Sequence, residues 1–199
     1  MSGLPLLASL QVMTGFFVLV GIQHISISLY DGRDRVHGFL GLVALATASI
    51  ALFRLLGHSA ETAESLVRFR QGEIISISLF CVFLLWFTAE YTAYKRRNLL
   101  ILLSAGWGLF IAVNILRPYG LVFSDLPELS SLRLVSGSHL LDLRLPADNL
   151  WNIALRAYVL GALAYCGFAS MRIKSLRNSH RARVLFGTTA LMAALCTLD

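Results

Sequence analysis

Charged and amide side chains interrupt long apolar stretches of this sequence, where such groups are costly to keep and therefore mark candidate functional sites. One set of these side chains is expected near the same membrane surface, at similar depth along the apolar stretches. It consists of Arg54, His58, Glu73, Asn114, Arg117 and Arg156, with Gln11 near them. Guanidinium groups pair carboxylates through two parallel hydrogen bonds, so this set predicts a ligand site for a small anionic or hydroxylated molecule. The alternative is structural, with the arginines reaching lipid headgroups or pairing with neighbouring acids.

Two histidines form a second candidate site, because His24 and His37 flank a short connection and can approach each other. Haem at His24 or His37 would need an imidazole that faces a flat apolar slot. A metal ion would need further ligands, for which Asp31 and Asp34 are the candidates. We expect instead that His24 hydrogen-bonds a neighbouring helix and that His37 reaches the membrane interface. The prediction is therefore no cofactor and no metal, with haem as the alternative.

The sequence lacks the common motifs of soluble enzymes. No P-loop, HExxH, GxSxG, GxGxxG or EF-hand pattern occurs, and the three cysteines lie in apolar runs without a CxxC pair. A proton pump would need a series of acids through its spans, and the sequence has none. We therefore predict that the chain is not an enzyme.

The elements that must position these side chains are membrane-spanning helices. The 199 residues are 57% hydrophobic and only 14% charged, with a mean hydropathy of +0.71. Soluble domains are about 45–50% apolar and about 25% charged. A span needs about 20 mostly apolar residues, and such runs predict an all-α integral membrane bundle of six helices in one domain, residues 1–199. The predicted spans are residues 4–30, 37–57, 73–94, 98–117, 149–171 and 183–198.

The two longer connections carry signals of their own. Between the second and third spans, Ser59 is a candidate N-cap and Gly72 a candidate C-terminal glycine, which together predict a short separate helix on the outer interface. Between the fourth and fifth spans, apolar and charged residues alternate on both sides of a turn-like Ser-Gly-Ser-His. This alternation predicts a β-hairpin over residues 132–145 that covers the polar groups.

Orientation follows from the basic residues. The connections after the first, third and fifth spans hold ten of the 17 basic residues and two acids. Such connections are cytoplasmic by the positive-inside rule, so the N-terminus is expected outside. The same distribution explains the pI of about 9.7 without a nucleic-acid partner. Six spans would also leave the C-terminus outside, and we expect the native chain to continue past Asp199 into a seventh span.

Residues 114–124, Asn-Ile-Leu-Arg-Pro-Tyr-Gly-Leu-Val-Phe-Ser, end the fourth span; Trp151 then opens the fifth, and a basic connection follows it. Over residues 73–199 this order resembles the N-terminal seven-span membrane module of bacterial signalling proteins such as sensor histidine kinases. Residues 135–138 are Val-Ser-Gly-Ser, where those modules have Pro-Trp-Gly-Glu. The resemblance implies a bacterial inner-membrane protein with a periplasmic N-terminus.

Together with the polar groups, this resemblance predicts a non-catalytic sensory input module that senses a ligand or partner at its outer face. The alternative is an accessory subunit that packs laterally against a larger energy-transducing membrane complex. Both predict the lipid bilayer and other membrane chains, as a homodimer or a larger complex, as partners.

Overall fold

The computed structural model describes residues 4–32, 34–60, 62–121, 123 and 150–172. Their helices are α1 (Leu4–Asp31), α2 (Arg35–His58), α3 (Ala63–Thr92), α4 (Arg97–Leu116) and α6 (Leu150–Met171). Each contains a segment long and apolar enough to cross a membrane. The described part of the chain is therefore all-helical and has the character of a membrane protein. The predicted sixth span, 183–198, and the hairpin, 132–145, lie outside the described residues.

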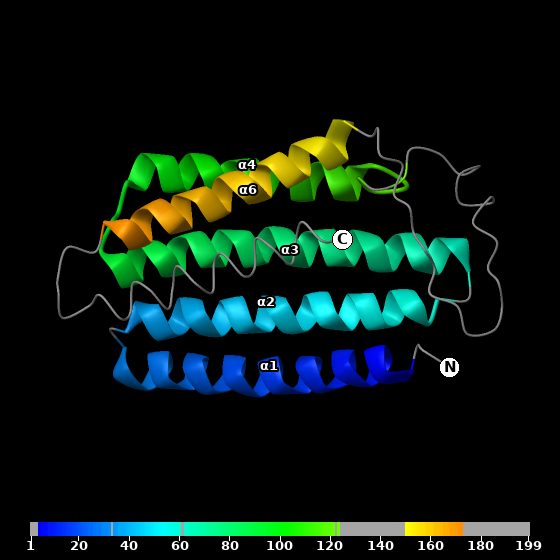
Figure 1. Cartoon of the computed structure of the whole chain (residues 1–199), viewed down its shortest axis with the longest axis horizontal. Helices are drawn as coiled ribbons and strands as arrows, with labels where there is room; N and C mark the ends of the chain where they lie inside the picture. The colour runs from blue at the N-terminus through cyan, green and yellow to red at the C-terminus, as the bar shows by residue number, and fades with distance from the viewer. Residues whose placement is uncertain (1–3, 33, 61, 122, 124–149, 173–199) are drawn as a thin grey trace.

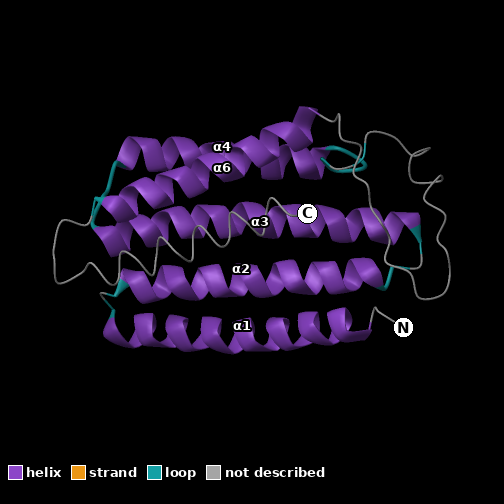
Figure 2. Ribbon diagram, in the orientation of Figure 1, coloured by secondary structure: helices purple, strands orange, loops and turns teal. Residues whose placement is uncertain are grey.

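The helices run up and down in chain order. Helices α1, α2 and α3 lie side by side in one row, and α4 and α6 both pack on α3 (Figures 1 and 2). One end of the bundle, here called the Glu73 end, contains the start of α1, α3 and α6 and the last turns of α2 and α4. The opposite end, called the Tyr94 end, contains the other helix termini. Polar groups at each end can therefore meet although they are far apart in sequence.

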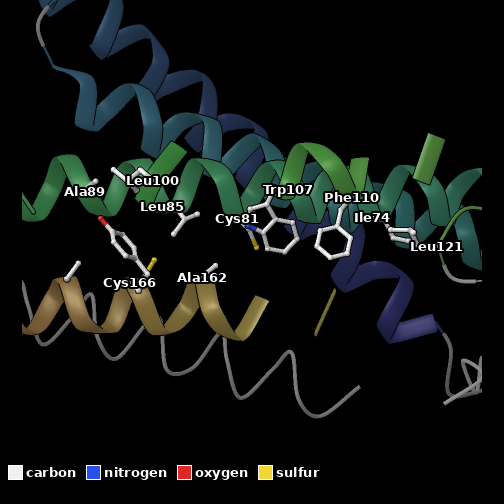
Figure 3. Packing of buried hydrophobic residues seen from close by; sticks show 12 residues of the cluster. Ile74, Cys81, Leu85, Ala89, Leu100, Trp107, Phe110, Leu121, Ala162 and Cys166 are labelled. Carbon is white, nitrogen blue, oxygen red and sulfur yellow. The ribbon is translucent and has the colours of Figure 1, made fainter. Parts of the chain in front are cut away.

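The main core lies between α3, α4 and α6. Trp107 is completely buried there, with its ring edge-to-face against Tyr158 at a centroid distance of 5.1 Å. Cys81, Ala162 and Cys166 belong to the same buried cluster, and Cys81 lies beside the Trp107 ring (Figure 3). The Tyr158 hydroxyl donates a hydrogen bond to the carbonyl oxygen of Leu103 at 3.2 Å and thereby connects α6 to α4.

The backbones of helices α1 and α2 approach each other closely at Gly21 and Gly41. A Cβ atom on Gly41 would lie 2.9 Å from the carbonyl oxygen of Gly21 and 3.0 Å from the amide nitrogen of Ile25. A larger residue at Gly41 would therefore push the two helices apart, and small residues are common where membrane helices pack backbone to backbone.

The prediction of a separate short helix before the third span was wrong, because α3 is continuous from Ala63. Thr62 is its N-cap and forms a reciprocal capping box with Ser65, whereas Ser59 caps the C-terminus of α2. Gly72 does not end a helix. It leaves room for Phe53 of α2, whose ring would overlap a Cβ atom at that position.

Candidate functional site

The centre of the Glu73 end is a buried carboxylate shared by two arginines. The Glu73 side chain is only 5% exposed, and its Oε1 accepts a hydrogen bond from Nε of Arg54 at 2.6 Å. Its Oε2 accepts from Nη1 of Arg70 at 2.5 Å. Arg70 lies one turn before Glu73 on α3, whereas Arg54 reaches across from α2. A buried carboxylate needs such partners, and this one also links two helices.

The cluster formed by Arg54, His58, Arg70 and Glu73, here called the Glu73 cluster, has an excess of positive charge. Among the residues that the structure describes, two guanidinium groups face one carboxylate, and His58 lies within electrostatic range of all three. The Arg54 side chain is 43% exposed and that of Arg70 is 28% exposed, so the cluster is open on its arginine side. The buried Nε of Arg70 has no hydrogen-bond partner among the residues described.

Asn114, also predicted as a site residue, has a structural role beside this cluster. Its fully buried side chain donates from Nδ2 to the carbonyl oxygen of Gln71 at 2.9 Å and accepts at Oδ1 from the amide of Leu121 at 3.1 Å. Gln71 returns the contact, donating from Nε2 to the carbonyl oxygens of Asn114 at 3.2 Å and Arg117 at 3.1 Å. This exchange fixes the end of α4 against α3, next to Arg70.

The remaining predicted residues are not part of the cluster. Arg117 places its guanidinium 5.5 Å from the ring centroid of Trp151, which joins the end of α4 to the start of α6 by a cation–π contact. Arg156 is exposed on α6 and forms no ion pair with another described residue. Gln11 is exposed on α1. The structure thus brings Arg54, His58 and Glu73 together.

Sequence reasoning missed Arg70 and Gln71, because both lay in the segment interpreted as a separate interfacial helix. The signal that could have found Arg70 is its three-residue spacing from Glu73, which places the two side chains on the same face of a helix. No sequence pattern singles out Gln71, because its contact with α4 depends on α3 running unbroken from Ala63.

At the Tyr94 end, His24 and His37 do meet. Their Nδ1 atoms are 2.7 Å apart and their rings are nearly parallel, at 14°. Asp34 caps α2 by accepting from the backbone amide of His37 at 3.1 Å. The expectation that His24 hydrogen-bonds a neighbouring helix is confirmed.

The same geometry bears on the metal and haem hypotheses. A tetrahedral metal ion bound by two imidazole nitrogens would hold them about 3.3 Å apart, because each metal–nitrogen bond is about 2 Å and the angle between the bonds is about 109°. The observed spacing of the Nδ1 atoms is too short for that. No group of three potential metal ligands occurs among the described residues. Haem ligation through another ring atom stays an untested alternative.

Comparisons of the chain with protein-family models, with curated proteins and with solved structures find no match.

Proposed function

We propose that this chain is a non-catalytic sensory input module of a bacterial inner-membrane signalling protein, and that the Glu73 cluster is its ligand-responsive site. The observation that carries the proposal is the buried Glu73 carboxylate, which is shared between an arginine of α2 and an arginine of α3. The two arginines are partly exposed to the outside of the bundle. A contact that holds two helices together and faces an accessible surface is one that a ligand can change.

The proposed mechanism is exchange of anions. Glu73 occupies both arginines in the absence of ligand, and an external carboxylate or phosphate competes for the same guanidinium groups. When the arginines pair with the ligand, the α2–α3 ion pair weakens and the two helices shift relative to each other. The ligand stabilises the shifted arrangement because it binds there more tightly, which is the condition for any ligand-driven conformational change. The shift would pass along α2 and α3 to the Tyr94 end.

The distribution of basic residues supports an orientation with the Glu73 end outside. Arg35, Lys95, Arg96, Arg97 and Arg172 all lie at the Tyr94 end of the described bundle, as expected for a cytoplasmic face. Labelling of single cysteines in intact cells with a membrane-impermeant reagent tests this orientation. Ser59→Cys is expected to react from outside and Arg35→Cys only after lysis, and the reverse pattern would overturn it.

Anion affinity in matched variants tests the exchange mechanism. The purified chain in lipid nanodiscs is titrated by calorimetry with succinate, a dicarboxylate, and with inorganic phosphate. Arg54→Gln removes a charge-assisted hydrogen bond and is expected to lower affinity about tenfold or more. Glu73→Gln removes the internal competitor and is expected to raise it by a similar factor. Arg68→Gln, an exposed arginine paired with Glu64 on the same helix, is the matched control and should leave affinity unchanged.

The response to Glu73→Gln separates exchange from a purely structural ion pair. If neither anion binds the unaltered chain or Glu73→Gln, the cluster only connects α2 and α3, and the proposal is wrong. The same conclusion follows if Arg68→Gln lowers affinity as much as Arg54→Gln.

The accessory-subunit alternative has one observation in its favour. Helix α1 packs on α2, and its large apolar side chains Val12, Leu19 and Leu29 are highly exposed in the described bundle. Such a face can lie against lipid or against another chain. Solubilisation in mild detergent followed by mass measurement distinguishes the two functions. A fixed-stoichiometry complex that forms through α1, without anion binding, would favour the subunit.

A further inference from the structure

A second charged site lies at the Tyr94 end, where the turn between α3 and α4 packs on the end of α6. Ala93 adopts a left-handed conformation at φ 55° and directs Tyr94 toward α6. The Tyr94 ring meets Phe168 edge-to-face at 5.8 Å, and its carbonyl oxygen accepts a hydrogen bond from the Tyr165 hydroxyl at 3.0 Å. The turn is therefore fixed against α6 by both aromatic and hydrogen-bonding contacts.

Two guanidinium groups form cation–π contacts with the rings of Tyr94 and Phe168. Arg96 lies 5.9 Å from the ring centroid of Tyr94, and Arg172 lies 5.0 Å from that of Phe168. Stacking on a ring leaves the N–H groups at the guanidinium edge available to an acceptor, and it reduces the freedom of the side chain before a ligand binds. We call Tyr94, Arg96, Phe168 and Arg172 the arginine–aromatic site.

The charge of these arginines is not compensated within the described part of the chain. The acid that lies closest in sequence to Arg96, Glu90, already pairs with Lys95 at 2.5 Å. Neither Arg96 nor Arg172 forms an ion pair with a described residue. An anion from outside the bundle would supply the missing partner.

The surroundings of the site indicate the class of anion. Phe168 is 42% exposed and Met171 is 70% exposed on the last turn of α6, so apolar surface adjoins the two guanidinium groups. A ligand that satisfies both surfaces has an anionic headgroup and an acyl chain. We propose that the arginine–aromatic site binds an anionic phospholipid, with its phosphate on Arg96 and Arg172 and its chain along the exposed face of α6. Basic pockets between helices at a membrane surface are suited to such headgroups.

Retention of lipid by the whole chain tests this proposal. The purified chain is placed in nanodiscs of phosphatidylcholine with added phosphatidylglycerol. Native mass spectrometry then releases the chain from the nanodisc, and the phosphatidylglycerol molecules that stay bound to it are counted. Loss of a charge-assisted hydrogen bond to a phosphate lowers affinity by about tenfold, so Arg96→Gln with Arg172→Gln is expected to lower phosphatidylglycerol affinity by about tenfold or more.

The control keeps the same change of charge at the same end of the bundle. Lys95→Gln with Arg97→Gln also removes two positive charges, but neither side chain is seated on the aromatic pair. A small effect of this control supports a defined site. An equal loss in both double variants means that general surface charge attracts the lipid, and it overturns the proposal.

Two further arms identify the source of the phosphate. Arg96→Lys retains the charge but lacks the planar donor edge, and it is expected to weaken phosphatidylglycerol binding while the chain stays folded. Inorganic phosphate without an acyl chain should displace phosphatidylglycerol poorly. Displacement by phosphate at matched concentration, or equal retention of phosphatidylcholine, would contradict binding of an anionic phospholipid.

Discussion

Replacement of Gly41 by alanine tests the close crossing of α1 and α2. A Cβ atom at this position would lie 2.9 Å from the carbonyl oxygen of Gly21, whereas ordinary contact begins at 3.4 Å. Because the obstructing atom belongs to the backbone, α1 must move away from α2 by about 0.5 Å. A gap of this size loses about a quarter of the dispersion attraction between the two helices at the crossing. Overpacking of this kind costs about 1–3 kcal/mol, and the better helix propensity of alanine offsets about 0.5–1 kcal/mol.

The expected net destabilisation by Gly41→Ala is therefore about 0–2.5 kcal/mol. Gly57→Ala on the same helix is the matched control, since nothing lies within 4 Å of its added Cβ atom. It should stabilise α2 by up to about 1 kcal/mol. The two variants should thus differ by about 2 kcal/mol, or about 30-fold in the unfolding equilibrium.

The assay is reversible unfolding of the purified chain in mixed micelles by added dodecyl sulfate, followed by helical circular dichroism. Equal midpoints for the two alanine variants would show that the glycine contact does not limit the packing of α1 on α2. That result would refute the steric reasoning.

The other predictions concern single contacts and use the same unfolding assay. Asn114→Ala leaves buried donors and acceptors without partners and is expected to cost about 2–4 kcal/mol, whereas Asn98→Ala on the exposed start of α4 should cost less than about 1 kcal/mol. Equal effects would remove the structural role assigned to Asn114. Thr62→Ala abolishes the capping box and should cost about 1 kcal/mol, with hydrogen exchange faster only in the first turn of α3. Lys95→Gln breaks the pair between the half-exposed Lys95 and Glu90, whose side chain is 14% exposed, and should lower stability by about 1 kcal/mol; a much larger loss would mean that water does not screen the charge left on Glu90.

Much of the helical arrangement could be predicted, because charged connections bound the apolar runs. The predicted spans 4–30, 37–57, 98–117 and 149–171 end within two residues of α1, α2, α4 and α6. The start of α3 could not be obtained in this way. Hydropathy follows only the apolar part of a helix, whereas Thr62 and Ser65 begin α3 through side-chain hydrogen bonds well before that part.

The candidate site was predicted in part for a similar reason. Depth along the spans was sufficient to place Arg54, His58 and Glu73 together, because helix ends of one bundle share a surface. Depth could not predict the reciprocal hydrogen bonds between Asn114 and Gln71, since these depend on which face of α4 packs on α3. The aromatic partners of Arg117 and Arg172 likewise depend on helix rotation, which the sequence pattern leaves open.

The most direct test of the proposed sensory mechanism is a distance measurement between the far ends of α2 and α3. Spin labels at Arg35→Cys and Lys95→Cys, in a chain whose native cysteines are replaced by alanine, report on the Tyr94 end while the anion binds at the Glu73 end. Saturating succinate or phosphate should shift the distribution of distances in nanodiscs, and the added substitution Arg54→Gln should abolish the shift. An unchanged distribution with bound anion would contradict the account, because the Glu73 cluster would then bind an anion without passing any displacement along the bundle.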